Sequence, residues 1–299
     1  MDMQSLHAFI CVAETESFSL AAQRLHLTQP AVSKRIAQLE ANLNSQLFDR
    51  LPRKAILTPH GEALLPKARH IINELMEIKT ELASLNGDIS GTLRIGTSHH
   101  IGLHHLPHFL RLFHNTYPQV TLAIQFLGSE AACEALAQGE LDIAFATLPL
   151  DEHAKLSMQA VWRDPLKFVC AHTHPLSKFK KPTLEDLGTF EAILPETDTV
   201  TFEIIENAFK REKVSLDRAL PSRYRETISK MSSYMETIKM MASVGLGWAV
   251  LPEHMANDTD LLTLNVGPKL LYRELGVLQR KGKTLSTAGQ AFLAILPQQ

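Results

Sequence analysis

The chain has 299 residues, of which 45% are hydrophobic and 21% charged, and its formal net charge is −2. This length and composition allow a large core and favour two domains over one. The sequence shows neither a secretory leader nor a long uncharged apolar run, so we expect a cytoplasmic protein without a membrane partner. Cys11, Cys133 and Cys170 lie far apart and form no CxxC pair, which argues against a disulfide scaffold and a zinc knuckle.

A basic segment occupies residues 19–59, where six basic side chains stand against two acidic ones in an otherwise acidic protein. Its first part predicts a short helix that Ser19 caps. The apolar residues that recur on one face of this helix are Leu20, Ala21 and Leu25. Thr28 is a good N-cap for a second helix, and Pro30 is tolerated in the first turn because N–H groups there have no intrahelical partner.

The second helix has an inward apolar stripe and a polar outer surface. The stripe consists of Val32, Ile36, Leu39 and Leu43. Two short helices joined by a tight turn, with polar and basic residues leading the second, are typical of a helix-turn-helix whose second helix enters the major groove. The residues that we expect to contact DNA from this element are Thr28, Gln29, Pro30, Ser33, Lys34, Arg35 and Gln38. A plain helical hairpin with a solvated charged face is the alternative.

Residues 47–61, LFDRLPRKAILTPHG, favour a two-stranded wing followed by a new helix, with Thr58 as its cap and Pro59 in its first position. Basic wing tips reach the phosphates and the minor groove of DNA. The basic residues at the predicted tip are Arg50, Arg53 and Lys54. A solvated hairpin would explain the wing alone, but it explains the wing and the two helices together much less well.

The stretch SFSLAAQRLHLTQPAVSKRIAQLEANLNSQLFDR, followed by LTPHG, resembles the winged helix-turn-helix of the LysR-type transcriptional regulators over about the first 60 residues. It departs from the family at Glu16 and Asn44, where glycine is usual, and at His60, where alanine is usual. Asparagine visits the left-handed backbone region more readily than most residues. The resemblance implies that the partner is an imperfect inverted repeat in double-stranded DNA, and that RNA polymerase is a further partner if the protein is an activator.

A heptad seam follows the wing. Its apolar residues, spaced alternately four and three apart, are Leu64, Ala68, Ile71, Leu75, Ile78, Leu82 and Leu85. Because the seam is narrow and its flanks are charged, we interpret residues 60–90 as a dimerisation helix and hinge, and the resemblance implies the same. The alternative is an amphipathic helix packed on its own domain. Asn86-Gly87 is expected to end the helix and Ser90-Gly91 to form the hinge.

Strands and helices alternate beyond residue 91, which is typical of βαβ units in a parallel sheet. We expect strands in TLRIGTS, VTLAIQF and LDIAFAT and around 157–171, 191–194, 221–226, 247–251 and 272–279, and helices at 103–116, 129–138, 201–213, 232–244 and 285–296. The segments YPQVTL, QGELDIAF, SVGLGWAVLPE and LSTAGQAFLAIL resemble the LysR effector domain more loosely. This resemblance implies two α/β lobes like those of a type 2 periplasmic binding protein.

The expected fold is therefore α/β with an N-terminal all-α winged helix-turn-helix. The DNA-binding domain would hold residues 1–59, the linker helix and hinge 60–90, and the effector-binding domain 91–299. Within the effector domain, lobe one would hold residues 92–163 and 267–299, and lobe two residues 164–266.

Ligands of open α/β sheets bind outside the carboxyl ends of the strands. The family's effector pocket maps onto such strand ends in lobe one and onto the facing segment of lobe two. The residues expected to line it are Thr97, Ser98, His99, His100, Gly128, Ser129, Thr147, Thr197, Thr201, Phe202 and Thr227. Each hydroxyl has an equal alternative as a helix N-cap, but several hydroxyls beside helix N-termini together suit a small anion.

Five of the 14 histidines lie in the segment SHHIGLHHLPH. His100, His104 and His108 would align on one unbroken helix, but Pro107 argues against that helix and favours a helix start just before it. No cysteine or paired carboxylate lies nearby in sequence to complete a tetrahedral metal set. We therefore interpret His99 and His100 as anion-binding groups and the others as surface histidines, and we expect neither a metal nor a cofactor. A metal-responsive regulator is the alternative.

An enzyme or a plain solute-binding protein on the same two-lobed fold is the competing class. A solute receptor would need an export signal. An enzyme would need a nucleophile or an acid–base pair at a recognisable spacing, and the chain contains no GxSxG, HExxH or phosphate loop. A redox sensor of the same family relies on a cysteine pair in the second lobe, where this chain has only Cys170. We therefore predict a non-enzymatic regulator, dimeric or tetrameric, that responds to a small-molecule effector.

Overall fold

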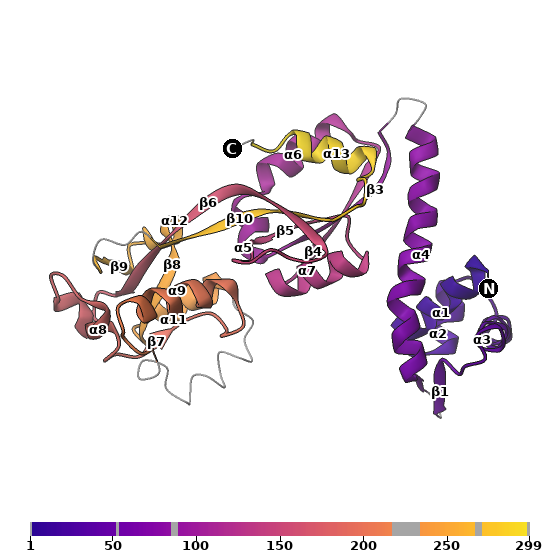
Figure 1. The fold of residues 1–299 in the computed structure, drawn as a ribbon, viewed down its shortest axis with the longest axis horizontal. Coiled ribbons are helices and arrows are strands. Elements are labelled where there is room, and N and C mark those ends of the chain that lie inside the picture. Colours follow the sequence, from indigo (N-terminus) through magenta and orange to yellow (C-terminus); the bar gives the residue numbers. More distant parts are fainter. Residues whose placement is uncertain (1, 52–53, 85–88, 217–233, 267–270, 298–299) are drawn as a thin grey trace.

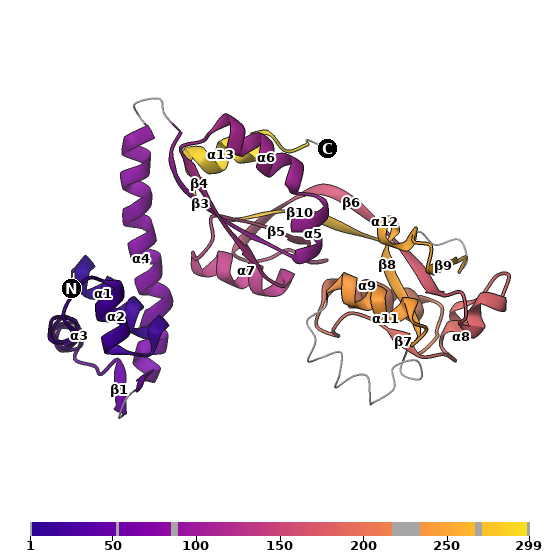
Figure 2. The same cartoon turned by 180° about the vertical axis from the view of Figure 1, so that it is seen from behind.

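The structure, a computed structural model, describes residues 2–51, 54–84, 89–216, 234–266 and 271–297. The winged domain lies at one end of the elongated molecule and the second lobe of the effector domain lies at the other (Figures 1 and 2). Several predicted features fall outside the described residues or side chains: Arg53, Leu85, Thr227, the strand at 221–226, and the side chains of Arg50 and Leu82.

The N-terminal domain is a winged helix-turn-helix around one apolar core. Its elements are α1 (Met3–Thr15), α2 (Phe18–Arg24), α3 (Gln29–Leu43) and an antiparallel hairpin of β1 (Phe48–Leu51) and β2 (Lys54–Leu57). The prediction that α3 begins after Thr28 is confirmed, although the Thr28 side chain makes no capping hydrogen bond. Val32, Ile36 and Leu39 are fully buried, as predicted, because they lie on the inward face of α3.

Three details of the helix-turn-helix prediction are wrong. Ser17, not Ser19, caps α2, because the Ser17 Oγ accepts a hydrogen bond from the Leu20 N–H at 3.3 Å. Leu20 and Leu43 do not face the core, since 53% and 38% of their surfaces are exposed. Apolar spacing identifies a helix, but it does not decide which of several neighbouring apolar residues turns inward.

Glu16 and Asn44 end α1 and α3 in the left-handed backbone region, with φ of 49° and 48°. Glycine adopts this region without steric cost, so the two departures from glycine noted in the sequence fall at the two positions where glycine would fit best. Glu16 is held there by two contacts with the wing. Its carbonyl accepts a hydrogen bond from the Ala55 N–H at 2.8 Å, and its carboxylate pairs with Lys54 at 2.6 Å.

The linker helix α4 spans Pro59–Ser84 and begins as predicted, because the Thr58 Oγ1 accepts a hydrogen bond from the Gly61 N–H at 3.2 Å. The predicted seam divides into two parts along this helix. Leu64 and Ala68 pack against the core of the winged domain. Farther along, Ile71, Leu75 and Ile78 are 36%, 37% and 49% exposed in the single chain.

The effector domain is built on a mixed sheet of eight strands among the described residues, in the order β4-β3-β5-β10-β6-β8-β7, with β9 also paired to β6. The strands are β3 (Gly91–Thr97), β4 (Val120–Phe126), β5 (Ile143–Thr147), β6 (Leu156–Ala171), β7 (Ala192–Ile193), β8 (Trp248–Pro252), β9 (Leu261–Leu264) and β10 (Leu271–Arg280). The expected parallel pairing holds for β3 with β4 and β5 and for β7 with β8. It is wrong for β6 and β10, which are antiparallel to their neighbours and run from one lobe into the other (Figure 1).

Helices cover the sheet in both lobes. They are α5 (His99–His104), α6 (Pro107–Thr116), α7 (Ser129–Gln138), α8 (Leu184–Leu187), α9 (Val200–Arg211), α11 (Met235–Ser243), α12 (Glu253–Ala256), α13 (Thr287–Ala294) and the 3-10 turn η1 (Pro175–Lys178). The helix expected at 103–116 is broken in two by Pro107, and its second part begins after Leu106, as the proline predicted. No helix in the described ranges combines the length and the apolar composition that a membrane crossing requires.

Candidate functional site

The outer face of α3 presents most of the residues that were predicted to contact DNA. Thr28, Gln29, Pro30, Lys34 and Gln38 are exposed, and Ser33 is half-buried. The Gln29 Nε2 donates a hydrogen bond to the Ser33 Oγ at 3.2 Å, so these two side chains form one polar unit at the start of the helix. This placement leaves Ser33 and Lys34 at the end of the helix that enters a major groove in this class of fold.

Two of the residues that were predicted to contact DNA form polar contacts with other residues of the winged domain. The Arg35 Nη2 donates to the Gln4 Oε1 on α1 at 2.8 Å, which directs the guanidinium toward α1. Lys54 pairs with Glu16 at the turn between α1 and α2. Lys54 therefore connects the wing to the rest of the domain, in addition to any contact with phosphate.

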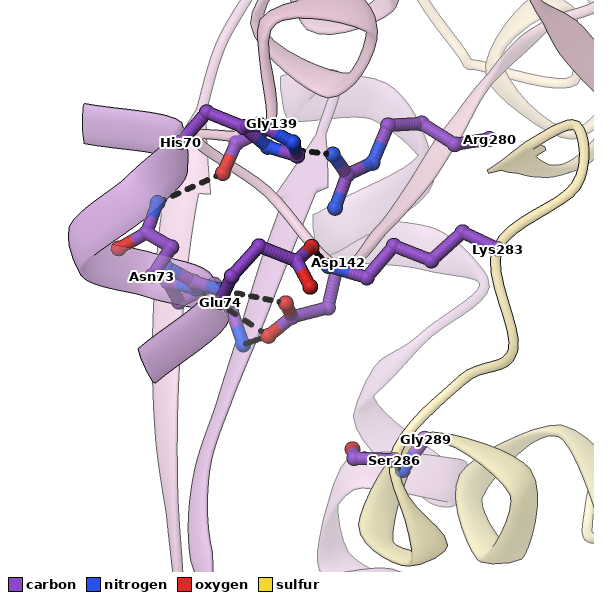
Figure 3. A network of polar contacts seen from close by, with 10 residues as sticks. His70, Asn73, Glu74, Gly139, Asp142, Arg280, Lys283, Ser286 and Gly289 are labelled. Atoms are coloured by element: carbon purple, nitrogen blue, oxygen red, sulfur yellow. Dashed lines mark hydrogen bonds and ion pairs between the residues drawn. The ribbon is translucent and has the colours of Figure 1, made fainter. Parts of the chain in front are cut away.

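Polar contacts join the linker helix to lobe one (Figure 3). The Asn73 Nδ2 donates to the Gly139 carbonyl at 2.7 Å, directly at the C-cap of α7. The Glu74 carboxylate accepts from the Lys283 Nζ at 2.6 Å, and this hydrogen bond holds the pKa of Glu74 below its usual value. Arg69 with Glu140 and His70 with Arg280 are further contacts between the linker helix and lobe one.

A cavity of about 220 Å³ lies between the lobes, and it includes most of the predicted effector residues. The structure brings together Ser98, His99, His100, Gly128, Ser129, Thr147 and Thr201 at its lining. Three other described candidates are not among the lining residues. Thr97 is fully buried, Phe202 packs into the core of lobe two, and Thr197 is exposed.

The hydroxyl groups around the cavity serve partly as structural caps. The Ser98 Oγ accepts a hydrogen bond from the Ile101 N–H at 3.4 Å and caps α5. Ser98 therefore has the helix N-cap role that was considered as the alternative from the sequence. The Ser129 Oγ accepts from the Thr147 N–H at 3.2 Å. Thr199, which sequence reasoning missed, caps α9 and also lines the cavity. The hydroxyl protons of Ser98 and Ser129 remain available for donation to a ligand, because both oxygens act as acceptors in these bonds.

An arginine that the sequence reasoning missed forms part of the cavity wall. The Arg273 Nε donates to Asp164 at 2.8 Å and its Nη1 donates to the Thr201 Oγ1 at 3.1 Å. Its Nη2 is buried without a hydrogen-bond partner among the described residues. A buried guanidinium N–H without an acceptor is costly, and an anionic ligand would satisfy it.

The cavity also has an acidic side, which the sequence reasoning missed. Glu130 lines it from the first turn of α7, and Glu196 and Asp198 line it from the loop before α9. Burial, together with the charges of Asp198 and Glu130, raises the pKa of Glu196. The cavity lining therefore contains a guanidinium as well as three carboxyl groups.

Histidines from both lobes meet next to this cavity. His100, only 5% exposed, has its Nε2 3.4 Å from the Asp164 Oδ2. The His254 ring, on α12 of lobe two, lies with its centroid 5.1 Å from that of His100 and 4.7 Å from that of His104. Burial lowers the pKa of His100 and of His254, and it lowers the pKa of His105 to about 4. These three imidazoles are consequently neutral at pH 7.

The interpretation of His105 as a surface histidine is wrong. Its ring packs on Trp162 with centroids 5.1 Å apart, and the side chain is half-buried. His108 is exposed beside Phe109, in agreement with its predicted surface position. His254 escaped notice because it follows the cluster by about 150 residues and no local pattern marks it.

The cysteines do not resemble a redox pair. Cys170 is fully buried in lobe two, and burial raises its pKa to about 11. The thiol is thus protonated at neutral pH, whereas the thiolate is the reactive form. Cys11 and Cys133 are also free, and burial raises their pKa values as well.

Comparison with known proteins agrees with this architecture. Residues 3–62 match the family described as "Bacterial regulatory helix-turn-helix protein, lysR family", and residues 86–299 match "LysR substrate binding domain". An uncharacterised HTH-type transcriptional regulator of Azotobacter vinelandii is 62% identical over 107 residues, which cover 36% of this chain and 74% of that protein. The HTH-type transcriptional activator CmpR of Synechocystis sp. is 28% identical over 98% of this chain and 94% of its own length.

A solved structure shares the whole fold. Full-length CbnR in complex with its target DNA superimposes with a TM-score of 0.67, covers 98% of each chain and is 20% identical. At this identity the likeness shows the fold alone. The two family matches together cover both the winged domain and the two-lobed domain, and the chain therefore belongs to the LysR-type transcriptional regulators.

Proposed function

We propose that this regulator reads its operator with α3 and the wing, and that a small effector bound between the two lobes changes the affinity or geometry of that binding. The cavity between the lobes carries the proposal. A ligand there contacts strand ends of lobe one and the start of α9 in lobe two, so it binds best when both lobes have one fixed arrangement. A ligand that binds one arrangement more tightly than another shifts their populations.

The chemistry of the cavity favours an effector with an anionic group. The free Nη2 of Arg273 supplies a charged donor, and the hydroxyls of Ser98 and Ser129 supply neutral donors. The N-termini of α7 and α9, both longer than two turns, add positive ends of helix dipoles. The acidic side of the cavity favours a second, hydrogen-donating group on the same molecule. A small carboxylate with an amino or hydroxyl group meets both requirements.

Helix α7 connects the cavity to the linker helix. Its first residue, Ser129, lines the cavity, and its C-cap, Gly139, accepts the hydrogen bond from Asn73 on α4. A displacement of α7 on effector binding would therefore reach the linker helix through about 15 Å of rigid helix. We propose that this contact links the state of the cavity to the position of the winged domain.

The exposed part of the α4 seam supports assembly into a dimer. Ile71, Leu75 and Ile78 present apolar side chains at heptad spacing on a helix whose first turns already pack on the winged domain. A second copy of α4 would bury these residues, and two winged domains would then be available for two half-sites of an inverted repeat.

A thermal-shift screen on the full chain tests the effector proposal. Amino acids, hydroxy acids and plain carboxylates of similar size are the probes. We expect stabilisation by carboxylates that also carry a donor group. For a compound found in this way, Ser98→Ala should lower affinity roughly ten- to a hundredfold, because a hydrogen bond to a charged group contributes about 1.5–3 kcal/mol.

Operator binding without effector should be unchanged in Ser98→Ala, since the cavity and the winged domain are separate units. Ser157→Ala, an exposed serine outside the cavity lining, is the matched control and should keep full effector affinity. Equal effector affinity in wild type and both variants would contradict the assignment of this cavity. Loss of operator binding in Ser98→Ala without effector would contradict the separation of the two functions.

A further inference from the structure

Three histidines from the two lobes meet at one point beside the effector cavity. His100 and His104 lie one turn apart on α5 in lobe one, and His254 lies on α12 in lobe two. Each offers a ring nitrogen, and these three nitrogens lie within 4.8 Å of one another. Two imidazole nitrogens bound to one tetrahedral zinc ion at about 2.0–2.1 Å are about 3.4 Å apart. To share one ion, the three nitrogens would have to approach one another by no more than the difference between these two distances.

His100, the buried histidine of this set, lacks a good hydrogen-bond partner. His100 is 5% exposed, and neither of its ring nitrogens has a hydrogen-bond partner among the described residues. Asp164 stands 3.4 Å from the His100 Nε2 and is also paired with Arg273 at 2.8 Å, which leaves the His100 Nδ1 as the nitrogen without any polar partner among the described residues. A buried polar group without a partner costs free energy, which bound metal would recover.

The surroundings of the set resemble the outer shell of a metal site. Histidine ligands usually direct their second nitrogen toward a carboxylate, which fixes the ring and raises its basicity. Asp164 stands 3.4 Å from His100, and Glu236 on α11 stands 3.4 Å from the His104 Nε2.

We propose that His100, His104 and His254 bind one divalent first-row transition-metal ion of the kind that imidazole prefers, such as zinc or nickel. The ion would join the two lobes, because α5 and α12 belong to different lobes. Three histidines leave a further coordination position open for water or for a donor atom of the effector. This site does not depend on the anionic effector proposed above, since it requires only the side chains of the protein.

Zinc binding to the tag-free full chain, stripped with EDTA and dialysed, tests the proposal. We expect one zinc ion per chain in competition with a chromophoric chelator. His104→Gln and His254→Gln should each weaken the binding at least about a hundredfold, because loss of a ligand exceeds the ten- to hundredfold effect of losing an outer partner. Both histidines are exposed, so these variants should fold. His108→Gln is the control from the same sequence segment and should bind zinc like wild type.

Cobalt binding gives a second readout that needs no variant. The wild-type chain should develop the visible absorption of four- or five-coordinate cobalt, and zinc should displace it stoichiometrically. Equal zinc affinity in wild type, His104→Gln and His254→Gln would overturn the proposal, as would cobalt that shows only the weak spectrum of the hydrated ion. Operator binding of the metal-free wild type is measured in parallel. It tests the proposed regulatory function independently of the metal site, so a failure of one proposal is distinguished from a failure of the other.

Discussion

Arg273 and Asp164 form a buried ion pair on the two strands that run through both lobes. The Arg273 Nε donates to the Asp164 Oδ2 at 2.8 Å, each side chain is 4% exposed, and the two residues are direct partners in the register of β10 and β6. Burial raises the pKa of Asp164, but the contact with His100 and the charge of Arg273 outweigh it and hold that pKa at about 2. The carboxylate is therefore charged at every physiological pH and depends on its partner.

Removal of one member of this pair should destabilise the effector domain. Arg273→Met leaves the Asp164 charge buried and unpaired, and we expect a loss of about 3–5 kcal/mol in the free energy of unfolding. The double variant Arg273→Met/Asp164→Leu should recover most of the loss, because it removes both charges. Urea unfolding at pH 7 measures the effect. A double variant as unstable as the single one would show that the pair has no specific role.

Alanine substitutions in α3 and in the wing should affect DNA binding in different ways. Ser33→Ala or Lys34→Ala should weaken operator binding by about 1–3 kcal/mol through lost base contacts. Arg53→Ala should lower affinity for any sequence and reduce the slope of log affinity against log salt by about one. Fluorescence anisotropy on operator and random DNA separates the two effects. Lys180→Ala, an exposed lysine of lobe two, is the control, and an equal response in all four variants would contradict the assignment.

A charge in the exposed part of the linker seam should break the dimer. Leu75 is 37% exposed in the single chain and lies mid-seam. Leu75→Glu would place a carboxylate in an apolar helix–helix contact, where burial of an unpaired charge is unfavourable. We expect a monomer by light scattering and loss of inverted-repeat binding. Leu150→Glu, at an exposed leucine outside the seam, should leave the assembly intact. A Leu75→Glu dimer as stable as wild type would rule out this seam as the main interface.

The stability of the effector domain should fall in mild acid, partly through His105. Burial, together with the neighbouring His100, lowers the pKa of His105 from 6.5 to about 4 in the folded protein. Between pH 6.5 and about 4 the unfolded chain consequently binds more protons at this residue than the folded chain does. The free energy of unfolding therefore decreases as the pH falls through this window.

His105→Gln removes this titration and should reduce the loss of stability between pH 7 and pH 5. Urea unfolding at both pH values measures the difference between the variant and wild type. His108→Gln, at the exposed histidine on α6, should lose as much stability as wild type. If all three proteins show the same pH dependence, His105 does not contribute to it.

Local patterns in the sequence were sufficient to predict those features that depend only on residues close together in the chain. The buried stripe of Val32, Ile36 and Leu39 and the bounds 129–138 of α7 follow from periodicity, and the cap of α4 by Thr58 follows from capping chemistry. The start of α3 after Thr28 agrees with the proline in its first turn. The interruption before Pro107 follows from the missing N–H of proline. These features depend on contacts within a few residues, which a single sequence displays directly.

Contacts between distant segments were decided only by the tertiary structure. Arg273 meets Asp164 across 109 positions of sequence, and His254 joins His100 from the opposite lobe. Periodicity does not reveal such meetings, because they depend on strand order, and β10 returns antiparallel between β5 and β6. Strand order is fixed by the packing of the whole core and not by any segment alone. The sequence therefore determined the family, the helices and the general place of the cavity, while the charges and the histidine cluster beside it arise from the way the chain folds back on itself.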